Sequence, residues 1–401
     1  MTHASVAGPL FARVFPIALT VGLIGVAASI FAAFTSPDLF FRAWLFGFQF
    51  WMGLSIGCLA ILPIQYLTGG AWGVATRRLL EPGAMLTPLM AAMFVPVLLG
   101  LPHIYLWAQP ERVASDEVLL HKAGYLNPTY FLIRSAVYFV LWTVLSLLFY
   151  HGSRQQDKLP DPAPTRRLEA LAGPGMALLV ASGSFAWMDW LMSLEPHWYS
   201  SIFPIMVLAG QALSSMAMIV GIACVIAEDD ELAIVLTPPR IHDLGTLLFT
   251  FTFFWAYLCY SQLIVIWAGN LKHEITWYLI RIAGGWTFVA AALFALAFVI
   301  PFFLLLFRQI KRDRRTLARI ALLAFVMQIV NAYWLSAPPF QSEGPEFHWQ
   351  YVSAFCAVGG IWVAGYAWLI RQRPFMPVYA PGYPNVVSPV DTPAAALAGG
   401  E

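Results

Sequence analysis

The stretch AWLFGFQFWMGLSIGCLAILPIQY, residues 43–66, contains no charged side chain. About 20 mainly apolar residues, each advancing about 1.5 Å along an α-helix, are enough to cross the roughly 30 Å hydrocarbon core of a bilayer. The stretch therefore predicts a transmembrane helix, and it sets the scale on which the rest of the chain is divided.

Further stretches of similar length and apolarity lie on both sides of this one. They predict an all-α polytopic membrane protein of about ten transmembrane helices. We assign residues 1–370 to one transmembrane domain, and residues 371–401, rich in Pro, Ala and Gly, to a cytoplasmic tail that is expected to be disordered. The predicted spans are residues 16–34, 43–66, 84–102, 130–150, 171–194, 200–226, 243–269, 283–307, 318–336 and 350–370.

The composition favours the same class. Of the 401 residues, 60% are hydrophobic and only 11% are charged, whereas about a quarter of the residues in an average soluble domain are charged. The chain has no Walker motif, no glycine-rich dinucleotide fingerprint and no nucleic-acid-binding module. We therefore expect the protein to act within the lipid bilayer or on proteins docked to it, and not on nucleic acid.

The positively charged side chains predict the orientation of the spans. Cytoplasmic loops of membrane proteins carry an excess of Lys and Arg. An even number of spans places both chain ends on one side, and that side holds 16 of the 22 Lys and Arg residues, while five lie on the other side and Arg134 lies within a span. This bias predicts that both termini are cytoplasmic.

The cysteines and histidines form no recognisable redox-cofactor motif. Cys58, Cys224, Cys259 and Cys356 lie far apart in apolar stretches, and no Cys-x-x-Cys is present. None of the eight histidines lies in the middle of a predicted span, where a pair of stacked b haems would need them. We therefore expect no redox cofactor and no metal site on this chain.

Ionisable side chains within a span are functional candidates because their burial in lipid is costly. Asp189 lies about 10 Å below the predicted outer end of the fifth span, and Ser193 follows one helical turn later. Glu195 and His197 come next, at the expected membrane surface. A carboxylate that leads to an acid and an imidazole suits proton exchange near neutral pH, so these four residues predict an outer proton-transfer site.

The same region has a structural interpretation that is compatible with the first. Arg134 in the fourth span is expected at a depth similar to that of Asp189, so the two predict an ion pair. The aromatic residues nearby are interpreted as anchors at the membrane interface, with a binding site as the alternative. They are Trp187, Trp190, Trp198 and Tyr199.

The seventh span carries the second candidate, a stripe of polar residues on one helical face that begins at Asp243 on the cytoplasmic side. Such a stripe can organise water into a proton path, but about 10 Å separate Thr250 from Tyr257, so water or a neighbouring helix has to bridge them. The alternatives are interhelical hydrogen bonding by the hydroxyl groups and a helix-end role for Asp243. The residues that follow Asp243 in the stripe are Thr246, Thr250, Tyr257 and Ser261.

Two weaker features receive mainly structural interpretations. Polar residues on the sixth and ninth spans predict interhelical packing contacts. The acidic residues 228–231 predict a solvated loop, with a docking patch as the alternative. The packing residues are Gln211, Ser214, Ser215, Gln328 and Asn331.

Four strings follow one another along the chain over roughly residues 50–285. The first two are YLTGGAWG at residues 66–73 with the arginines at 77 and 78, and Lys122 with Tyr125-Leu126-Asn127. The more specific two are DWLMSLEPHWYS at residues 189–200 and the segment from Asp243-Leu244-Gly245 to Asn270. In this order they resemble the ActF-type membrane subunit of alternative complex III, a quinol:cytochrome c oxidoreductase. One departure is LKHE at residues 271–274, where the family pattern would place an acidic pair.

The resemblance implies a fold similar to that of NrfD-like, polysulfide-reductase-type membrane subunits, with two four-helix bundles flanked by outer helices. It implies a place in the respiratory chain of a bacterial inner membrane. The implied partners are membrane lipid, an NrfD-like sister subunit, an iron–sulfur protein and multihaem c-type cytochromes, and these subunits would bind the quinol, the iron–sulfur clusters and the c-type haem. This chain would be a non-catalytic subunit that contributes a polar half-channel for protons.

Three hypotheses follow from the sequence. The first is a cofactor-free integral subunit of a quinol-oxidising respiratory complex that provides a proton half-channel. The second is a stand-alone proton-coupled secondary transporter, although the charged groups within spans lie near the span ends and not at the midplane where transporters bind substrate. The third is a purely structural scaffold subunit.

Overall fold

The computed structural model describes residues 7–157, 161–227 and 236–372, and within these ranges the chain forms helices and connecting loops without a β-strand. Ten helical segments in these ranges are long and apolar enough to cross a membrane, which confirms the predicted all-α polytopic class. The expected tail beyond residue 372 and the acidic residues 228–231 lie outside the described residues.

The first half of the described chain contains α1 (Ala7–Thr35), α2 (Pro37–Thr68), α3 (Ala71–Met85), α4 (Thr87–Met93), α5 (Val95–Leu99), α6 (Leu101–Ile104), η1 (Leu106–Ala108), α7 (Pro110–Ser115), α8 (Glu117–Lys122), α9 (Pro128–Gln156) and α10 (Ala163–Trp190). The second half contains η2 (Met192–Leu194), α11 (Phe203–Ile226), α13 (Pro238–Gly269), α14 (Thr276–Ile282), α15 (Trp286–Ala292), η3 (Leu293–Val299), α16 (Ile300–Leu306), α17 (Arg308–Arg312), α18 (Arg314–Ser336) and α19 (Trp349–Ile370).

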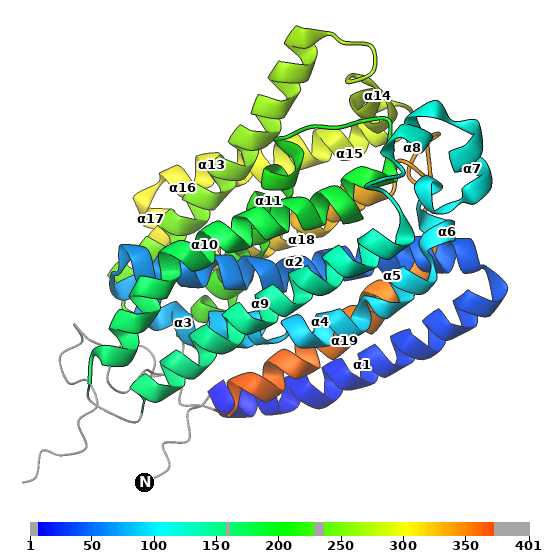
Figure 1. Ribbon diagram of the computed structural model, residues 1–401. Coiled ribbons are helices and arrows are strands. Elements are labelled where there is room, and N and C mark those ends of the chain that lie inside the picture. Colours follow the sequence, from blue (N-terminus) through cyan, green and yellow to red (C-terminus); the bar gives the residue numbers. More distant parts are fainter. Residues whose placement is uncertain (1–6, 158–160, 228–235, 373–401) are drawn as a thin grey trace, which may run out of the picture.

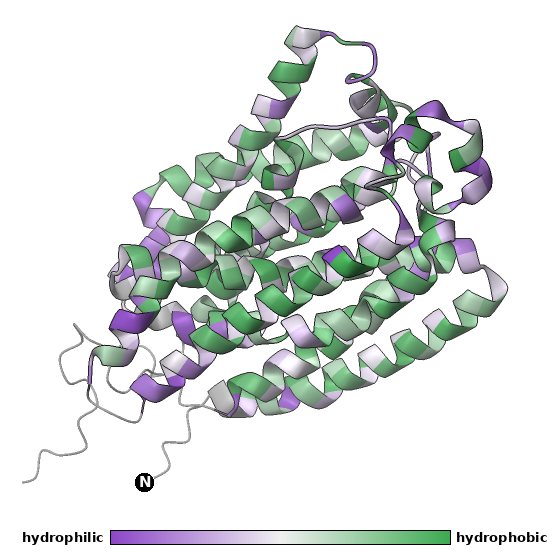
Figure 2. Cartoon of the chain, in the orientation of Figure 1, coloured by the Kyte–Doolittle hydropathy of each residue, from purple (hydrophilic) through white to green (hydrophobic). Residues whose placement is uncertain are grey.

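The long helices run roughly side by side, and the start of α1 and the end of α19 lie at the same end of the bundle (Figure 1). We call this end the chain-end side, and the opposite end, where α7 and α8 lie, the loop side. Apolar residues dominate the long helices, while hydrophilic residues gather toward the two ends (Figure 2). This distribution is that of an integral membrane protein whose long helices cross the bilayer.

Helix α2 lies at the centre of the fold. Nearly all of its side chains from Ala43 onward are buried, because it packs against α3, α10, α11 and α19. Small residues permit the closest approach: a Cβ atom on Gly57 would lie 2.3 Å from the carbonyl oxygen of Gln211 in α11. Such small residues let transmembrane helices pack backbone against backbone.

Most of the other helices fall into two groups, and α2 contacts members of both. Helices α3–α6, α9 and α10 make up the first group, and α11, α13, α16 and α18 with η3 make up the second. The flanking helices α1 and α19 pack closely on each other and on α2, and a Cβ atom on Gly25 would lie 2.4 Å from the backbone nitrogen of Ala357.

The third span differs from its predicted bounds of 84–102. In the structure it covers Thr76–Leu99 and is divided into α3, α4 and α5. Prolines stand in the first turns of α4 and α5, because proline has no N–H and its ring clashes with the carbonyl group four residues earlier. A side chain satisfies one carbonyl group near the first break, since the Thr87 hydroxyl donates to the Ala84 oxygen at 2.8 Å.

Candidate functional site

Asp189 lies in the last turn of α10, and its side chain is fully buried. Arg134 of α9 donates two hydrogen bonds to its carboxylate, from Nε to Oδ2 at 2.8 Å and from Nη2 to Oδ1 at 3.0 Å. Tyr138, one turn further along α9, donates a third to Oδ2 at 2.9 Å. A buried carboxylate requires such partners, because an unpaired buried charge is strongly unfavourable. The structure therefore brings Arg134 and Asp189 together and adds a tyrosine to the pair.

Arg134 also connects the pair to the loop side. Its guanidinium group lies 3.9 Å from the centre of the Tyr125 ring, and its Nη1 donates to the Tyr125 carbonyl oxygen at 3.0 Å. The Arg134 side chain is 20% exposed, whereas that of Asp189 is 0% exposed. Burial, together with the charge of Asp189, raises the pKa of the Tyr125 phenol to about 12, so this ring stays neutral at physiological pH.

The other three residues of the predicted outer site have partners of their own. Ser193 donates its hydroxyl hydrogen bond to the backbone carbonyl oxygen of Asp189 and not to the carboxylate. His197 is about half exposed, and its Nε2 lies 2.7 Å from Oδ2 of Asp116. Glu195 pairs with an arginine from another helix. These contacts hold the four residues near the loop side but do not join them in one hydrogen-bonded relay.

The partner of Glu195 is Arg281 of α14, which is 1% exposed, and their Nη1 and Oε1 atoms are 2.7 Å apart. Arg281 also donates to the carbonyl oxygens of Trp277 and Leu335, at 3.1 Å and 3.0 Å, and stacks 3.9 Å from the Trp277 ring. Burial lowers the pKa of Arg281 and the charge of Glu195 opposes that shift. This second buried ion pair joins α14 to the segment that follows η2, and the hydrogen bond to Leu335 joins α14 to α18.

The interpretation of the tryptophans as interface anchors is wrong for three of them. Trp187, Trp190 and Trp198 are at most 3% exposed and pack inside the protein. The ring of Trp198 stacks on that of Trp277 with 5.1 Å between centroids. Tyr199 differs, since it is exposed. The three indole rings therefore fill the core beneath the loop side and do not face lipid.

A further buried charged cluster lies at the chain-end side, on α3. Arg78 and Glu81 are 3% and 2% exposed, and Arg78 Nη1 lies 3.0 Å from Glu81 Oε2. Arg78 also donates to the Ser153 hydroxyl oxygen at 3.1 Å and pairs with Asp157 near the end of α9. These opposite charges pair with one another inside the protein, and the third span, which begins at Thr76, includes Arg78 and Glu81 ahead of its predicted start.

Both clusters contact the same helix, α9. Tyr138 binds Asp189 near the loop side, and Ser153 binds Arg78 near the chain-end side. From Tyr138 to Ser153 the helix rises about 22 Å, which is most of the thickness of the hydrocarbon core. Between them, the Trp142 indole donates to a serine hydroxyl of α10 at 2.9 Å. A buried carboxylate cluster therefore lies toward each membrane face along one helix.

The stripe on α13 lies apart from these clusters. The side chain of Asp243 is 56% exposed, and so is Tyr257. Thr246 and Thr250 each donate to the backbone carbonyl oxygen four residues earlier on α13, and Ser261 is half-buried. The stripe thus faces outward from this chain, so a water path along it would require a cover of lipid or of another protein.

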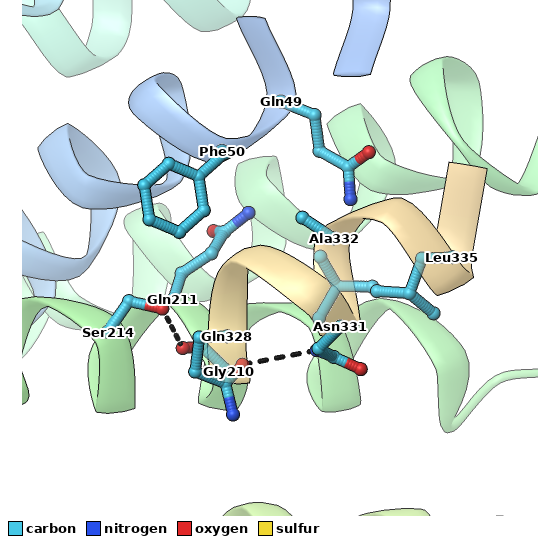
Figure 3. A pocket seen from close by; sticks show the side chains of 10 residues that line it. Gln49, Phe50, Gly210, Gln211, Ser214, Gln328, Asn331, Ala332 and Leu335 are labelled. Carbon is cyan, nitrogen blue, oxygen red and sulfur yellow. Dashed lines mark hydrogen bonds between the residues drawn. The ribbon is translucent and has the colours of Figure 1, made fainter. Parts of the chain in front are cut away.

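A small polar cavity of about 20 Å³ lies between α2, α11 and α18 (Figure 3). This is room for a single water molecule. Gln49, Gln211, Gln328 and Asn331 line it, and Asn331 donates to Gln328 Oε1 at 3.1 Å. Neither polar atom of the Gln211 amide has a hydrogen-bond partner within the part of the chain that the structure describes. Buried polar groups are normally satisfied, so the cavity has the chemistry of a structural water site.

Sequence reasoning missed Glu81, Tyr138 and Arg281. Helical spacing contained a signal for two of them, because Tyr138 follows Arg134 by four residues and Glu81 follows Arg78 by three. Nothing in the local sequence joins Arg281 to Glu195, since that contact depends on how α14 folds back.

Within the described residues, no three His, Cys, Asp or Glu side chains lie close enough together to hold a metal ion. Comparison of the chain with protein-family models and with curated proteins finds no match.

Proposed function

We propose that the protein is an integral membrane subunit of a quinol-oxidising respiratory complex of the alternative complex III type, in a bacterial inner membrane with both termini in the cytoplasm. The chain carries no redox cofactor of its own in this proposal. Quinol, iron–sulfur clusters and c-type haem are bound by an NrfD-like sister subunit, an iron–sulfur protein and multihaem cytochromes. The four ordered strings between roughly residues 50 and 285 support this assignment.

The role of this chain within the complex is to provide part of a proton path. The observation that supports this role is the pair of buried carboxylate clusters that contact α9, one around Asp189 of α10 and one around Glu81 of α3. Ionisable groups inside a membrane protein are costly and tend to mark proton or ion pathways. Their positions near opposite faces favour two half-channels, because their contact residues lie roughly 22 Å apart along α9, which is far too long for direct proton transfer and has to be bridged by water.

Proton exchange at the Asp189 cluster has a specific physical requirement. The Asp189 carboxylate is fully buried and accepts hydrogen bonds from Arg134 and Tyr138. Arg134 is partly exposed and lies between the buried Asp189 carboxylate and the loop side, so its guanidinium group has to move before water from that side can reach the carboxylate. The ion pair thus acts as a gate between Asp189 and the surface.

The bidentate geometry also supports a second function, that of a structural scaffold. Arg134 and Tyr138, which both bind the Asp189 carboxylate, lie on α9, so these contacts join α9 to α10 whether or not protons move. The two functions differ in one measurable way. If the pair is only structural, breaking it lowers the stability of the protein but leaves proton release unchanged in the complex that still assembles.

Membership of a complex is tested by purification from native membranes in a mild detergent. The proposal expects the chain to co-elute with partners that absorb as c-type haem and to show quinol oxidation in that fraction. A monodisperse, haem-free protein that shows proton-coupled uptake in liposomes would instead favour the stand-alone transporter.

A further inference from the structure

A second, much larger cavity of about 570 Å³ opens at the chain-end side between α1, α11, α18 and α19. Its volume falls within the range of small-molecule binding pockets, roughly 300–1,000 Å³. The walls are almost entirely apolar and include Phe11, Trp51, Phe325 and Trp362. None of these residues belongs to the two carboxylate clusters that contact α9.

The charged residue that lines this cavity is Arg319 of α18. Its side chain is exposed, and it has no hydrogen-bond or ion-pair partner in residues 7–157, 161–227 and 236–372. Arg315 lies one turn nearer the chain-end side on the same helix and is exposed too, as is Arg13 on α1. Phe325, on the deeper wall, lies about 9 Å beyond Arg319 along α18. The cavity therefore carries one positive charge in its lining, at Arg319, with two further exposed arginines outside the lining, and it is apolar in its depth.

We propose that this cavity binds an anionic membrane phospholipid, with an acyl chain in the apolar interior and the phosphate group at Arg319. Arg319 lies nearer the chain-end side than the apolar residues such as Phe325. This order matches a lipid in a bilayer, whose headgroup lies at the interface and whose acyl chain points inward. Basic pockets between transmembrane helices select anionic headgroups by charge, whereas a zwitterionic headgroup gains much less from the same arginines. The cavity lining has almost no polar group that could bind a water-soluble ligand.

Gly221 of α11 provides a direct way to block the site. It lines the cavity, and a Cβ atom built on it would meet no other atom within 4 Å. A leucine at this position would therefore extend into the space of the acyl chain without a clash against the backbone. Gly173 of α10 is a matched control, because a Cβ atom there also meets nothing within 4 Å and the residue does not line the cavity.

The experiment uses the full chain, purified and equilibrated in mixed micelles with equal amounts of phosphatidylglycerol and phosphatidylcholine. Retained lipid per protein is measured by mass spectrometry after removal of free lipid. We expect the unmodified protein to retain phosphatidylglycerol preferentially, and Gly221→Leu to reduce the retained amount at least about fivefold. Arg319→Gln should lower the ratio of phosphatidylglycerol to phosphatidylcholine about fivefold, the factor for about 1 kcal/mol per basic side chain at a membrane surface.

Gly173→Leu and Arg166→Gln, an exposed arginine on α10, should both behave as the unmodified protein. The proposal is overturned if Gly221→Leu retains as much phosphatidylglycerol as the unmodified protein. An unchanged lipid ratio in Arg319→Gln overturns the headgroup assignment. If Gly221→Leu does not fold, the ratio in Arg319→Gln decides by itself, because that side chain is exposed and its replacement leaves the core intact.

Discussion

Arg134 and Asp189 form two parallel hydrogen bonds across the contact between α9 and α10, from Nε to Oδ2 at 2.8 Å and from Nη2 to Oδ1 at 3.0 Å. Such fork-like pairing fixes both the distance and the orientation of the two side chains. Asp189 is fully buried, whereas Arg134 is partly exposed. The pair therefore joins α9 to α10 and also connects the protein interior to the loop side.

Removing the charge of Asp189 should destabilise the protein. In Asp189→Asn the guanidinium group of Arg134 loses its counter-charge. We expect the free energy of unfolding to fall by about 3 kcal/mol, at the low end of the range for breaking a buried ion pair, because Arg134 is partly exposed. Thermal unfolding in a mild detergent measures this. The charge-exchanged protein with Arg134→Asp and Asp189→Arg should recover part of the loss, and an unchanged unfolding temperature in Asp189→Asn would contradict the structural role of the pair.

Tyr138→Phe isolates the third hydrogen bond of the Asp189 carboxylate. We expect the free energy of unfolding to fall by about 1–2 kcal/mol. The acceptor is a charged group, which strengthens the hydrogen bond, but hydrogen bonds between transmembrane helices contribute less to stability. Tyr130→Phe is the control, because Tyr130 is exposed on the same helix. Equal unfolding temperatures for the two variants would show that the Tyr138 hydroxyl contributes nothing.

Arg281→Lys should loosen the loop side without unfolding the core. A lysine cannot reproduce the planar contacts to Glu195, Leu335 and the Trp277 ring together. We expect faster amide hydrogen exchange in residues 271–285, with α2 unchanged. Arg112→Lys, at an exposed loop-side position, serves as the matched control, and equal exchange in both variants would argue against Arg281 as the fastening of α14.

The start of α8 should depend on pH. Desolvation opposes ionisation of Asp116, yet hydrogen bonds from the Leu119 and Val118 amides and from His197 hold the pKa of Asp116 below its ordinary value. A depressed pKa stabilises the folded loop at every pH above the unfolded value of about 3.9, and this contribution is lost as the pH falls through the lower folded value. Protection factors of the Val118 and Leu119 amides should fall at acid pH, and in Asp116→Ala they should be low at pH 7 already.

The spans were predictable because hydrophobic length is a local property. Each of the ten predicted segments overlaps one of the ten helical segments that qualify as spans. The third span shows the limit of this reasoning. Arg78 and Glu81 lie before the predicted start of this span, but they form an ion pair and Arg78 also contacts Ser153 of α9, so charged residues lie within the helix.

Contacts in the candidate site can be predicted from the sequence only where two residues lie at similar depths along their helices. Arg134 and Asp189 meet because both lie a similar distance below the loop side, which can be counted along the sequence. The contact of Glu195 with Arg281 depends on the fold of a loop, and the outward face of the α13 stripe depends on which side of α13 its neighbours occupy. Neither follows from the periodicity of a single helix.

The most direct test of the proton path is the ratio of protons released to quinol oxidised, measured with the purified complex in liposomes. Asp189→Asn and Glu81→Gln are compared with Glu117→Gln, which changes an exposed carboxylate on α8. The account predicts that each of the first two lowers the ratio in the complex that assembles, while Glu117→Gln leaves it unchanged. Quinol oxidation and proton release that both stay at the unmodified level in Asp189→Asn and Glu81→Gln would contradict it.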